Sequence, residues 1–459
     1  MMKRLLLILA LLAIPAFASG PPNFTILSLP DLQFMSDYCQ STQLPGIVSW
    51  ISANKTTLNI LAVVGEGDSW DTPDTAQITC FNTYFVAPLL ALGIPVIITP
   101  GNHDYDPVLP IVNGQISFPA GRSLTLWTTN ILTPIQAQSA YQANWTPGAT
   151  GLSTVAPIAW GSGQTPGAYN VIGSCSGVTG CSCSTLPVIS VTVGSGGTVS
   201  QYNLPTVTTA GSCTGTVSPT FALTGTGGTA ATFQGALLGA EAPAAYWIKI
   251  NDGGYPFGLI STGYCPLAGE TAWEQGVMAA NNFPFFAVTH AAVYSAGTTQ
   301  ATPVGTLSTL TSPATLSCNA SNFGSNTQVY DPTAQSGVMI WSALQSSANL
   351  FFQINGHFTT NTPPAFTAHI DEVGTNGNDV PHEFFNHQED TYYGWVRILQ
   401  VQPTAGQILV STYNPFLASY LTDPQNQFTE PYNIPYTSGS TSNVGMSGSA
   451  VMSGNAVIQ

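Results

Sequence analysis

The chain has 459 residues and a formal net charge of −15, with only six lysine and arginine residues. Such an acidic surface repels nucleic acid and anionic membranes, so neither class of partner is expected. The hydrophobic fraction of 44% is enough for a sizeable core, in one large domain with an insertion or in two to three ordinary domains. With so few basic side chains, an anionic substrate would have to be attracted by bound metal.

Residues 1–18 have the pattern of a secretory signal peptide. Lys3 and Arg4 precede the apolar stretch Leu5–Ile14, and Ala16-Phe17-Ala18 provides a small-x-small cleavage site. A membrane anchor is the alternative, but this stretch is short for a bilayer and no later segment has the length of a membrane helix. The sequence therefore predicts a secreted, periplasmic or cell-surface protein.

The chain contains eight cysteines, and an even number in an exported chain favours disulfide bonds. Cys39 and Cys80 flank the second predicted strand, so we predict that they are linked to each other. The cluster of Cys175, Cys181 and Cys183 could instead bind zinc. Its spacing differs from that of a zinc knuckle and no histidine is near in sequence, which favours disulfides here too.

Five short apolar runs, bounded by Gly, Pro or Asn, predict buried strands. They are Phe24–Pro30, Leu58–Val64, Ile94–Ile98, Phe283–Val288 and Leu350–Ile354. Helical periodicity over 44–55 and 77–92 joins the first three runs in the strand–helix order of a layered α/β core. A helix around 335–348 and strand-like runs at 392–399 and 407–413 extend this core, the last two as a hairpin that closes the sheet.

The composition changes between residues 150 and 242, which are rich in Gly, Ser and Thr and nearly free of charge. Val188–Val193 and Thr220–Thr224 alternate like strands, and four cysteines argue against a flexible loop. We therefore expect an inserted β-rich domain that projects near the entrance of the site. The predicted parts are a signal peptide (1–18), the first part of the core (19–149), the insert (150–242), the second part of the core (243–430) and a low-complexity tail (431–459).

Each of the five runs ends at a residue that can bind metal, in the order Asp31, Asp68, Asn102, His290 and His357. Ligands gather beyond the carboxyl ends of strands in layered α/β folds, so we expect these side chains to converge. Their oxygen and nitrogen donors suit Zn²⁺, Mn²⁺ or Fe. Asp68 could bridge two cations, and such a pair activates water and grips the oxygens of a phosphoryl group.

The motifs, taken in order, resemble those of the calcineurin-like metallophosphoesterases. They are Asp31-x-Gln33, Gly67-Asp68-x-x-Asp71, Gly101-Asn102-His103-Asp104, His290 and Gly356-His357. The match covers about residues 24–125 and 283–418, and Leu29-Pro30-Asp31-x-Gln33 is similar to a secreted bacterial subgroup. The resemblance implies an α+β fold, a layered β-sandwich flanked by helices, with the β-rich lobe inserted.

The resemblance also implies a function and a division of roles. The chain would hydrolyse small phosphomonoesters or phosphodiesters through two divalent metal ions and a metal-bound hydroxide. One metal would be held by Asp68, Asn102, His290 and His357, and the other by Asp31, Gln33 and the shared Asp68. His103 would act near the leaving group as a proton donor or charge stabiliser.

The sequence departs from the family pattern at one of these two metals. The usual Gly-His-x-His ending is here Gly356-His357-Phe358-Thr359, and Gln33 stands where histidine is usual. Thr359 and Gln33 both fall on the same metal, so we expect one tightly held cation and one that exchanges readily. His369 could substitute as a ligand, with an ordinary loop histidine as the alternative.

The departure keeps other functions open. One is a catalytically weak or inactive phosphoesterase-like surface or assembly protein, whose contacts would involve the insert and the tail. Another is a zinc hydrolase for esters other than phosphate.

Five further polar residues have less certain roles in the sequence: three allow either a functional or a structural role, and two are expected at the surface. Asp71 and Asp104 could orient metal-bound histidines or water, or they could cap helices. Arg122 could reach a substrate phosphate or form a structural salt bridge. His382 and His387 lie in an acidic, polar stretch and are expected at the surface.

Overall fold

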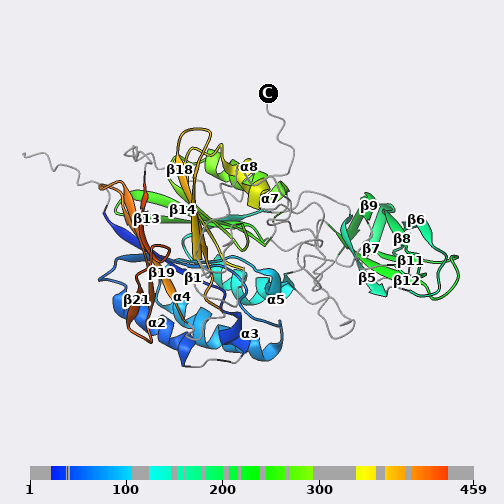
Figure 1. Cartoon of the computed structure of the whole chain (residues 1–459), viewed down its shortest axis with the longest axis horizontal. Helices are drawn as coiled ribbons and strands as arrows, with labels where there is room; N and C mark the ends of the chain where they lie inside the picture. Colours follow the sequence, from blue (N-terminus) through cyan, green and yellow to red (C-terminus); the bar gives the residue numbers. More distant parts are fainter. Residues whose placement is uncertain are drawn as a thin grey trace, which may run out of the picture.

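The core of the computed structural model consists of two seven-stranded sheets with helices on their outer sides (Figure 1). The structure describes residues 22–37, 39, 42–105, 124–145, 152–159, 161–176, 181–199, 206–215, 219–237, 244–264, 266, 268–292, 337–357, 367–388 and 394–432. It is thus a mixed α/β protein in which strands outnumber helices. The expected signal peptide and tail lie outside the described residues.

The first sheet has the strand order β21-β20-β19-β1-β2-β3, and β22 pairs with β20. Its strands are β1 (Phe24–Leu29), β2 (Ile60–Gly65), β3 (Val96–Ile98), β19 (Val396–Gln402), β20 (Gln407–Asn414), β21 (Ser419–Leu421) and β22 (Gln427–Pro431). Strands β1, β2 and β3 are parallel, and β19 lies antiparallel to β1. The predicted strand–helix–strand–helix–strand order is therefore present, and the carboxyl ends of β1, β2 and β3 share one edge.

Helices connect these strands along the outer side of the first sheet. They are α1 (Gln33–Asp37), α2 (Gln43–Asn54), α3 (Thr75–Phe81), the π-helical η2 (Asn82–Val86), α4 (Ala87–Ala91), the 3₁₀ turn η3 (Asn102–Asp104), α5 (Thr125–Trp127), the π-helical η4 (Thr128–Leu132) and α6 (Thr133–Gln136). Helix α3 begins after Asp74, whose carboxylate accepts a hydrogen bond from the backbone N–H of Gln77 (2.9 Å). The run predicted as one helix over 77–92 is thus three consecutive helical segments.

The second sheet has the order β17-β18-β16-β15-β14-β13-β4. Its elements are β4 (Tyr141–Asn144), β13 (Tyr246–Asp252), β14 (Tyr255–Gly263), α7 (Ala268–Ala279), β15 (Phe285–Thr289), α8 (Gly337–Leu344), β16 (Leu350–Asn355), β17 (Thr367–Val373) and β18 (Asp379–Phe385). Strands β14, β15, β16 and β18 run parallel. Figure 1 shows α7 and α8 on one outer side of the core and α2, α3 and α4 on the other.

The two sheets face each other across an apolar interior. Phe24 of β1 stacks on Phe257 of β14, with 4.6 Å between ring centroids. Along β15, Phe286 belongs to this interior cluster, whereas its neighbour Phe285 belongs to a second cluster with the helices α7 and α8. Both faces of β15 are therefore covered, which explains why a continuous apolar run rather than an alternating one encodes this strand.

Residues of the predicted insert form three small sheets of their own (Figure 1). Their strands are β5 (Leu152–Ala159), β6 (Gly167–Ile172), β7 (Cys181–Thr185), β8 (Val188–Val193), β9 (Thr206–Thr209), β10 (Ser212–Gly215), β11 (Thr220–Leu223) and β12 (Ala231–Leu237). Val191, Phe221 and Phe233 lie in an apolar cluster within these strands. The domain boundaries and a position beside the site entrance remain predictions.

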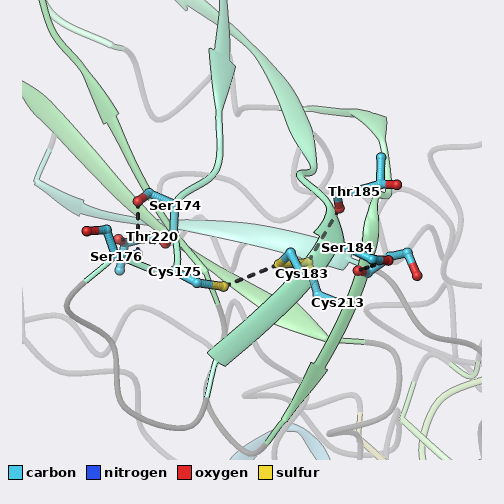
Figure 2. The surroundings of a disulfide bond; sticks show 9 residues. Ser174, Cys175, Ser176, Cys183, Ser184, Thr185, Cys213 and Thr220 are labelled. Carbon is cyan, nitrogen blue, oxygen red and sulfur yellow. Dashed lines mark hydrogen bonds between the residues drawn. A yellow bond between two sulfur atoms is a disulfide. The ribbon is translucent and has the colours of Figure 1, made fainter.

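Cysteines connect two strands inside this lobe. A disulfide joins Cys183 of β7 to Cys213 of β10, and the sulfur of Cys175 lies 3.2 Å from that of Cys183 (Figure 2). The two strands also pair through their backbones, with Cys213 opposite Cys183 in the register. Covalent and backbone bonds thus hold the same pair of strands, and the disulfide interpretation of this cluster agrees with the structure.

The other disulfide that the structure describes links Cys39 to Cys80, 41 residues apart in sequence, which is the pair that the sequence predicts. Replacing both cysteines by alanine should lower the free energy of unfolding by about 2–4 kcal/mol, because the unfolded chain gains the freedom of that loop. Urea unfolding followed by tryptophan fluorescence measures this change. An unfolding midpoint equal to that of the parent protein would show that the bond contributes nothing.

Three histidines lie in places that their local sequence did not indicate. His382, expected at the surface, is fully buried in β18 with its ring against Trp341 (4.8 Å between centroids). His387, also expected at the surface, is only 4% exposed. His369 belongs to strand β17 rather than a loop, and its ring stacks on Phe428 at 4.1 Å. The surface expectation was wrong because Trp341 of α8 covers the face of β18 that carries His382, and because the ring of His387 packs against Phe385 and Trp395.

Among the described residues, no helix has both the length and the apolar character needed to span a bilayer.

Candidate metal centre

The carboxyl ends of parallel strands from both sheets meet at one place. Asp31 follows β1, Asp68 follows β2 and Asn102 follows β3 in the first sheet, while His290 follows β15 and His357 follows β16 in the second. The structure brings these side chains together, and Asp68, His290 and His357 each offer a ligand atom within 4.8 Å of the others. The convergence follows from parallel strand order within each sheet.

His290 stands at the centre of this cluster. Its Nε2 lies 3.0 Å from Oδ1 of Asn102, 3.1 Å from Nδ1 of His357 and 3.3 Å from Oδ2 of Asp68. Neighbouring ligand atoms around a tetrahedral metal with bonds of about 2.0 Å stand roughly 3.3 Å apart. The three distances from Nε2 of His290 are therefore close to the spacing of neighbouring ligands in a coordination shell.

The ring of His290 is fixed in this orientation by its other nitrogen. Nδ1 donates a hydrogen bond to the backbone carbonyl of Glu66 (2.6 Å). In a neutral imidazole this contact makes Nε2 the nitrogen with a free electron pair, and Nε2 is the atom that faces Asp68 and His357. The backbone after β2 thus sets which nitrogen of His290 can bind a cation.

The loops that carry these side chains have unusual backbone conformations. Asp68 has φ of 48° and His357 has φ of 74°, both in the left-handed region that non-glycine residues rarely adopt. Gly67, with φ of 110°, lies so close to His290 that a Cβ at this position would overlap Nδ1 of that ring. Strain of about 1–3 kcal/mol per such residue is tolerated mainly at functional sites.

Asp31 and Gln33 lie beside this set. Oδ2 of Asp31 accepts hydrogen bonds from the backbone N–H of His357 (3.1 Å) and from Nδ2 of Asn386 (2.8 Å). Oδ1 of Asp31 and Oε1 of Gln33 are buried and have no hydrogen-bond partner among the described residues. Two buried oxygen acceptors without a donor are what a cation site would contain.

Sequence reasoning missed two residues of this region. Glu66 is fully buried directly after β2, and Asn386 holds Asp31 from the end of β18. The only sequence signal for Glu66 is its place directly after a predicted strand, and the flanking Gly65 and Gly67 indicate a loop instead. Asn386 had no signal, because β18 was not predicted.

The Asn102–Asp104 turn places His103 at the accessible side of the cluster. Nδ1 of His103 donates to the backbone carbonyl of Asp71 (2.6 Å) and lies 3.6 Å from the Asp71 carboxylate, and the side chain is 21% exposed. Asp104 accepts from the N–H groups of Ser69 (2.9 Å) and Gly101 (2.7 Å). Asp71 therefore orients His103, and Asp104 joins the two loops by capping their backbones.

Burial and mutual charge shift the pKa of several of these groups. Burial raises the pKa of Asp31 well above its usual range, and burial with the charge of Asp68 raises the pKa of Asp104 to about 7. Burial lowers the pKa of His290, but Asp68 and Asp31 together raise it to about 9. Burial and the neighbouring His290 lower the pKa of His357 to about 3. The region concentrates carboxyl groups that protons or cations must neutralise.

Two predicted site residues, Arg122 and Thr359, lie outside the described residues. His369 contacts Phe428 and has its Nε2 3.7 Å from Glu430, and it is not among the described residues of the strand-end cluster.

Comparisons with known proteins find only distant structural similarity. No family model and no curated protein matches the chain. Among solved structures, it is similar to a dimetal phosphatase from Danio rerio, with 10% identity, a TM-score of 0.39, and coverage of 90% of this chain and 99% of that one. It is also similar to GAP50, described as the anchor in the inner membrane complex of Plasmodium, with 8% identity, a TM-score of 0.36, and coverage of 90% and 89%. At these values the functional assignment rests on the strand-end cluster itself.

Proposed function

We propose that the chain is an exported, metal-dependent phosphoesterase. The observation that carries this proposal is a set of four donor atoms, Nε2 of His290 and the three atoms around it from Asp68, Asn102 and His357. Imidazole, carboxylate and amide donors in this number suit Zn²⁺, Mn²⁺ or Fe²⁺. The disulfides and the signal-like residues 1–18 support export.

The residues present fit a metal pair. Asp68, Asn102, His290 and His357 would hold one cation, and Asp31, Gln33 and the carboxylate of Asp68 would contribute to the other. When bound, such cations supply positive charge for phosphate oxygens and lower the pKa of water. The chain has almost no lysine or arginine to do this, so the metal ligands would be the main determinant of phosphate affinity.

His103 is the residue of the cluster suited to proton transfer. Its Nδ1 donates to the carbonyl of Asp71 (2.6 Å), which fixes the orientation of the ring. It is partly exposed, whereas Asp68 and His290 are buried, so a substrate would approach from its side. We propose that His103 donates a proton to the leaving-group oxygen or stabilises charge there.

The test is an assay of the purified chain after chelation and after reloading with Mn²⁺ or Zn²⁺. Hydrolysis of an aryl phosphomonoester or a bis-aryl phosphodiester should disappear with chelator and return with metal. His103→Asn should keep its metal content and lose about 10²–10⁴-fold in kcat. Hydrolysis of carboxylate esters alone, or phosphatase activity that is unchanged after chelation, would contradict the proposal.

The alternative is a phosphoesterase-like surface or assembly protein with little activity. Gln33, whose amide is a weaker ligand than imidazole, favours it, and so does a lobe whose strands pair only with one another among the described residues. The same assay decides between the two. Metal bound at the cluster without turnover of any phosphate ester would favour the alternative.

A further inference from the structure

Two buried carboxylate oxygens without hydrogen-bond partners lie close together beside the cluster described above. Glu66 and Asp31 are 0% and 3% exposed, and neither Oε2 of Glu66 nor Oδ1 of Asp31 has a hydrogen-bond partner among the described residues. Nδ1 of His290 lies 3.7 Å from Oδ1 of Asp31, beyond hydrogen-bond distance. The second oxygen of each group is held in place. Ser28 donates to Oε1 of Glu66 (2.5 Å), and His357 and Asn386 donate to Oδ2 of Asp31.

The position of Gly356 locates the two unpartnered oxygens. A Cβ on Gly356 would lie 2.6 Å from Oδ1 of Asp31 and 3.0 Å from Oε2 of Glu66. Both oxygens therefore approach the same backbone position, and a side chain at residue 356 would crowd them apart. Two carboxylates so placed repel each other unless a proton or a cation lies between them.

One cationic group lies beside Asp31, because Nδ1 of His290 is 3.7 Å from its Oδ1, but that nitrogen already donates to the backbone carbonyl of Glu66. The other described cations are engaged elsewhere. Lys55 and Lys249 make their described contacts elsewhere, with the carbonyl of Leu92 and the ring of Phe283. The guanidinium of Arg397 is bonded to Glu383. A divalent cation is the partner that satisfies both unpartnered oxygens at once.

We propose that Glu66 is a metal ligand and that, with Asp31, it forms an oxygen-only cation site next to the one centred on His290. This rests on the proposed function and deepens it. Carboxylate and amide oxygens favour hard divalent cations of the Mn²⁺ and Mg²⁺ kind, whereas imidazoles favour Zn²⁺. Glu66 thus takes over the contribution that the missing histidines at positions 33 and 359 would have made, and the two sites differ in the metal they select.

Equilibrium dialysis of the metal-free full chain against Mn²⁺, and separately against Zn²⁺, tests this assignment. The parent protein should bind two Mn²⁺ with unequal affinity. Glu66→Gln should weaken one of them by about 100-fold or more and leave the other within about twofold, because a lost ligand should exceed the 10–100-fold typical of outer contacts. His357→Ala should affect the other Mn²⁺ and the Zn²⁺ site instead.

Glu274→Gln is the matched control. Glu274 lies on α7, is fully buried, and has no hydrogen-bond partner for either carboxylate oxygen among the described residues. Its replacement should leave both affinities unchanged. Should Glu66→Gln fail to fold, Ser28→Ala removes the contact that positions Glu66 and should weaken the same Mn²⁺ by about tenfold.

The outcomes separate this inference from the proposed function. Two Mn²⁺ whose affinities do not change in Glu66→Gln, or a single Mn²⁺ in the parent protein that the variant still binds, would overturn the role of Glu66 alone. A parent protein that binds no Mn²⁺ or Zn²⁺ would overturn both.

Discussion

His290→Ala is expected to abolish tight metal binding and, with it, phosphate-ester hydrolysis. His290 contributes the atom that Asn102, Asp68 and His357 all surround at 3.0–3.3 Å. Without it, the remaining donors have no common centre, and the affinity for Zn²⁺ should fall by more than about 100-fold, beyond the effect of losing an outer contact. Zinc titration followed by the shift in melting temperature measures this loss.

His382→Ala is the control for this variant, because His382 is equally buried but lies in β18 against Trp341. Both variants remove a buried imidazole, so both should lose a similar amount of free energy of unfolding. Only the response of the melting temperature to zinc should differ between them. His357→Ala, at a partly exposed position, gives a second test with less damage to packing. An unchanged zinc-induced shift in His290→Ala would contradict the assignment.

Arg397→Met should produce the largest loss of stability that the described residues allow us to anticipate. The guanidinium is fully buried, lies 3.3 Å from the carboxylate of Glu383, and donates to Thr412 (3.1 Å) and to Asn426 (3.2 Å). Phe385 covers it at 4.7 Å. Removing this cation leaves Glu383 buried and unpaired, which typically costs about 3–5 kcal/mol. Urea unfolding measures the change.

Two further variants show whether charge pairing is the reason. Lys249→Met changes another strand cation, but one that is exposed and lies over Phe283, so it should cost less than about 1 kcal/mol. Combining Arg397→Met with Glu383→Leu should recover much of the lost stability, because no charge is then left unpaired. Equal losses in the single and the double variant would point to packing instead.

The convergence of the metal-binding residues could be predicted because its signals are local. Each strand of the set is a short apolar run, and a residue such as Asp68 or His290 follows it within a few positions. Parallel order then brings the ends together along one edge of each sheet. The packing of the two sheets, which no local signal contains, brings the two edges together. The Cys39–Cys80 bond could be predicted in the same way, from two cysteines flanking one strand.

Glu66 could not be found in this way because what buries it is distant in sequence. Its carboxylate contacts Ser28, 38 residues away, and Gly356, which its Oε2 approaches, follows β16 of the other sheet. The two glycines that flank Glu66 indicate a loop, and nothing in the local pattern shows that the loop points inward.

His382 illustrates the opposite error. It lies in an acidic, polar stretch of the sequence, which indicated a surface position. In the structure, α8 covers one face of β18 through Trp341, and Arg397 of the first sheet pairs with Glu383 on the other. A buried strand can contain a polar residue when its hydrogen-bond or ionic partner lies on another element. Because that partner is distant in sequence, the residues around the polar position do not reveal it.

Anomalous diffraction at the zinc edge from crystals grown with Zn²⁺ shows whether the strand ends of the two sheets hold a metal ion. We expect a peak at the carboxyl ends of β2 and β15, about 2.0–2.2 Å from the side chains of Asp68, His290 and His357. A peak elsewhere on the molecule, or none with the His290 ring turned away from Asp68 and His357, would contradict this assignment.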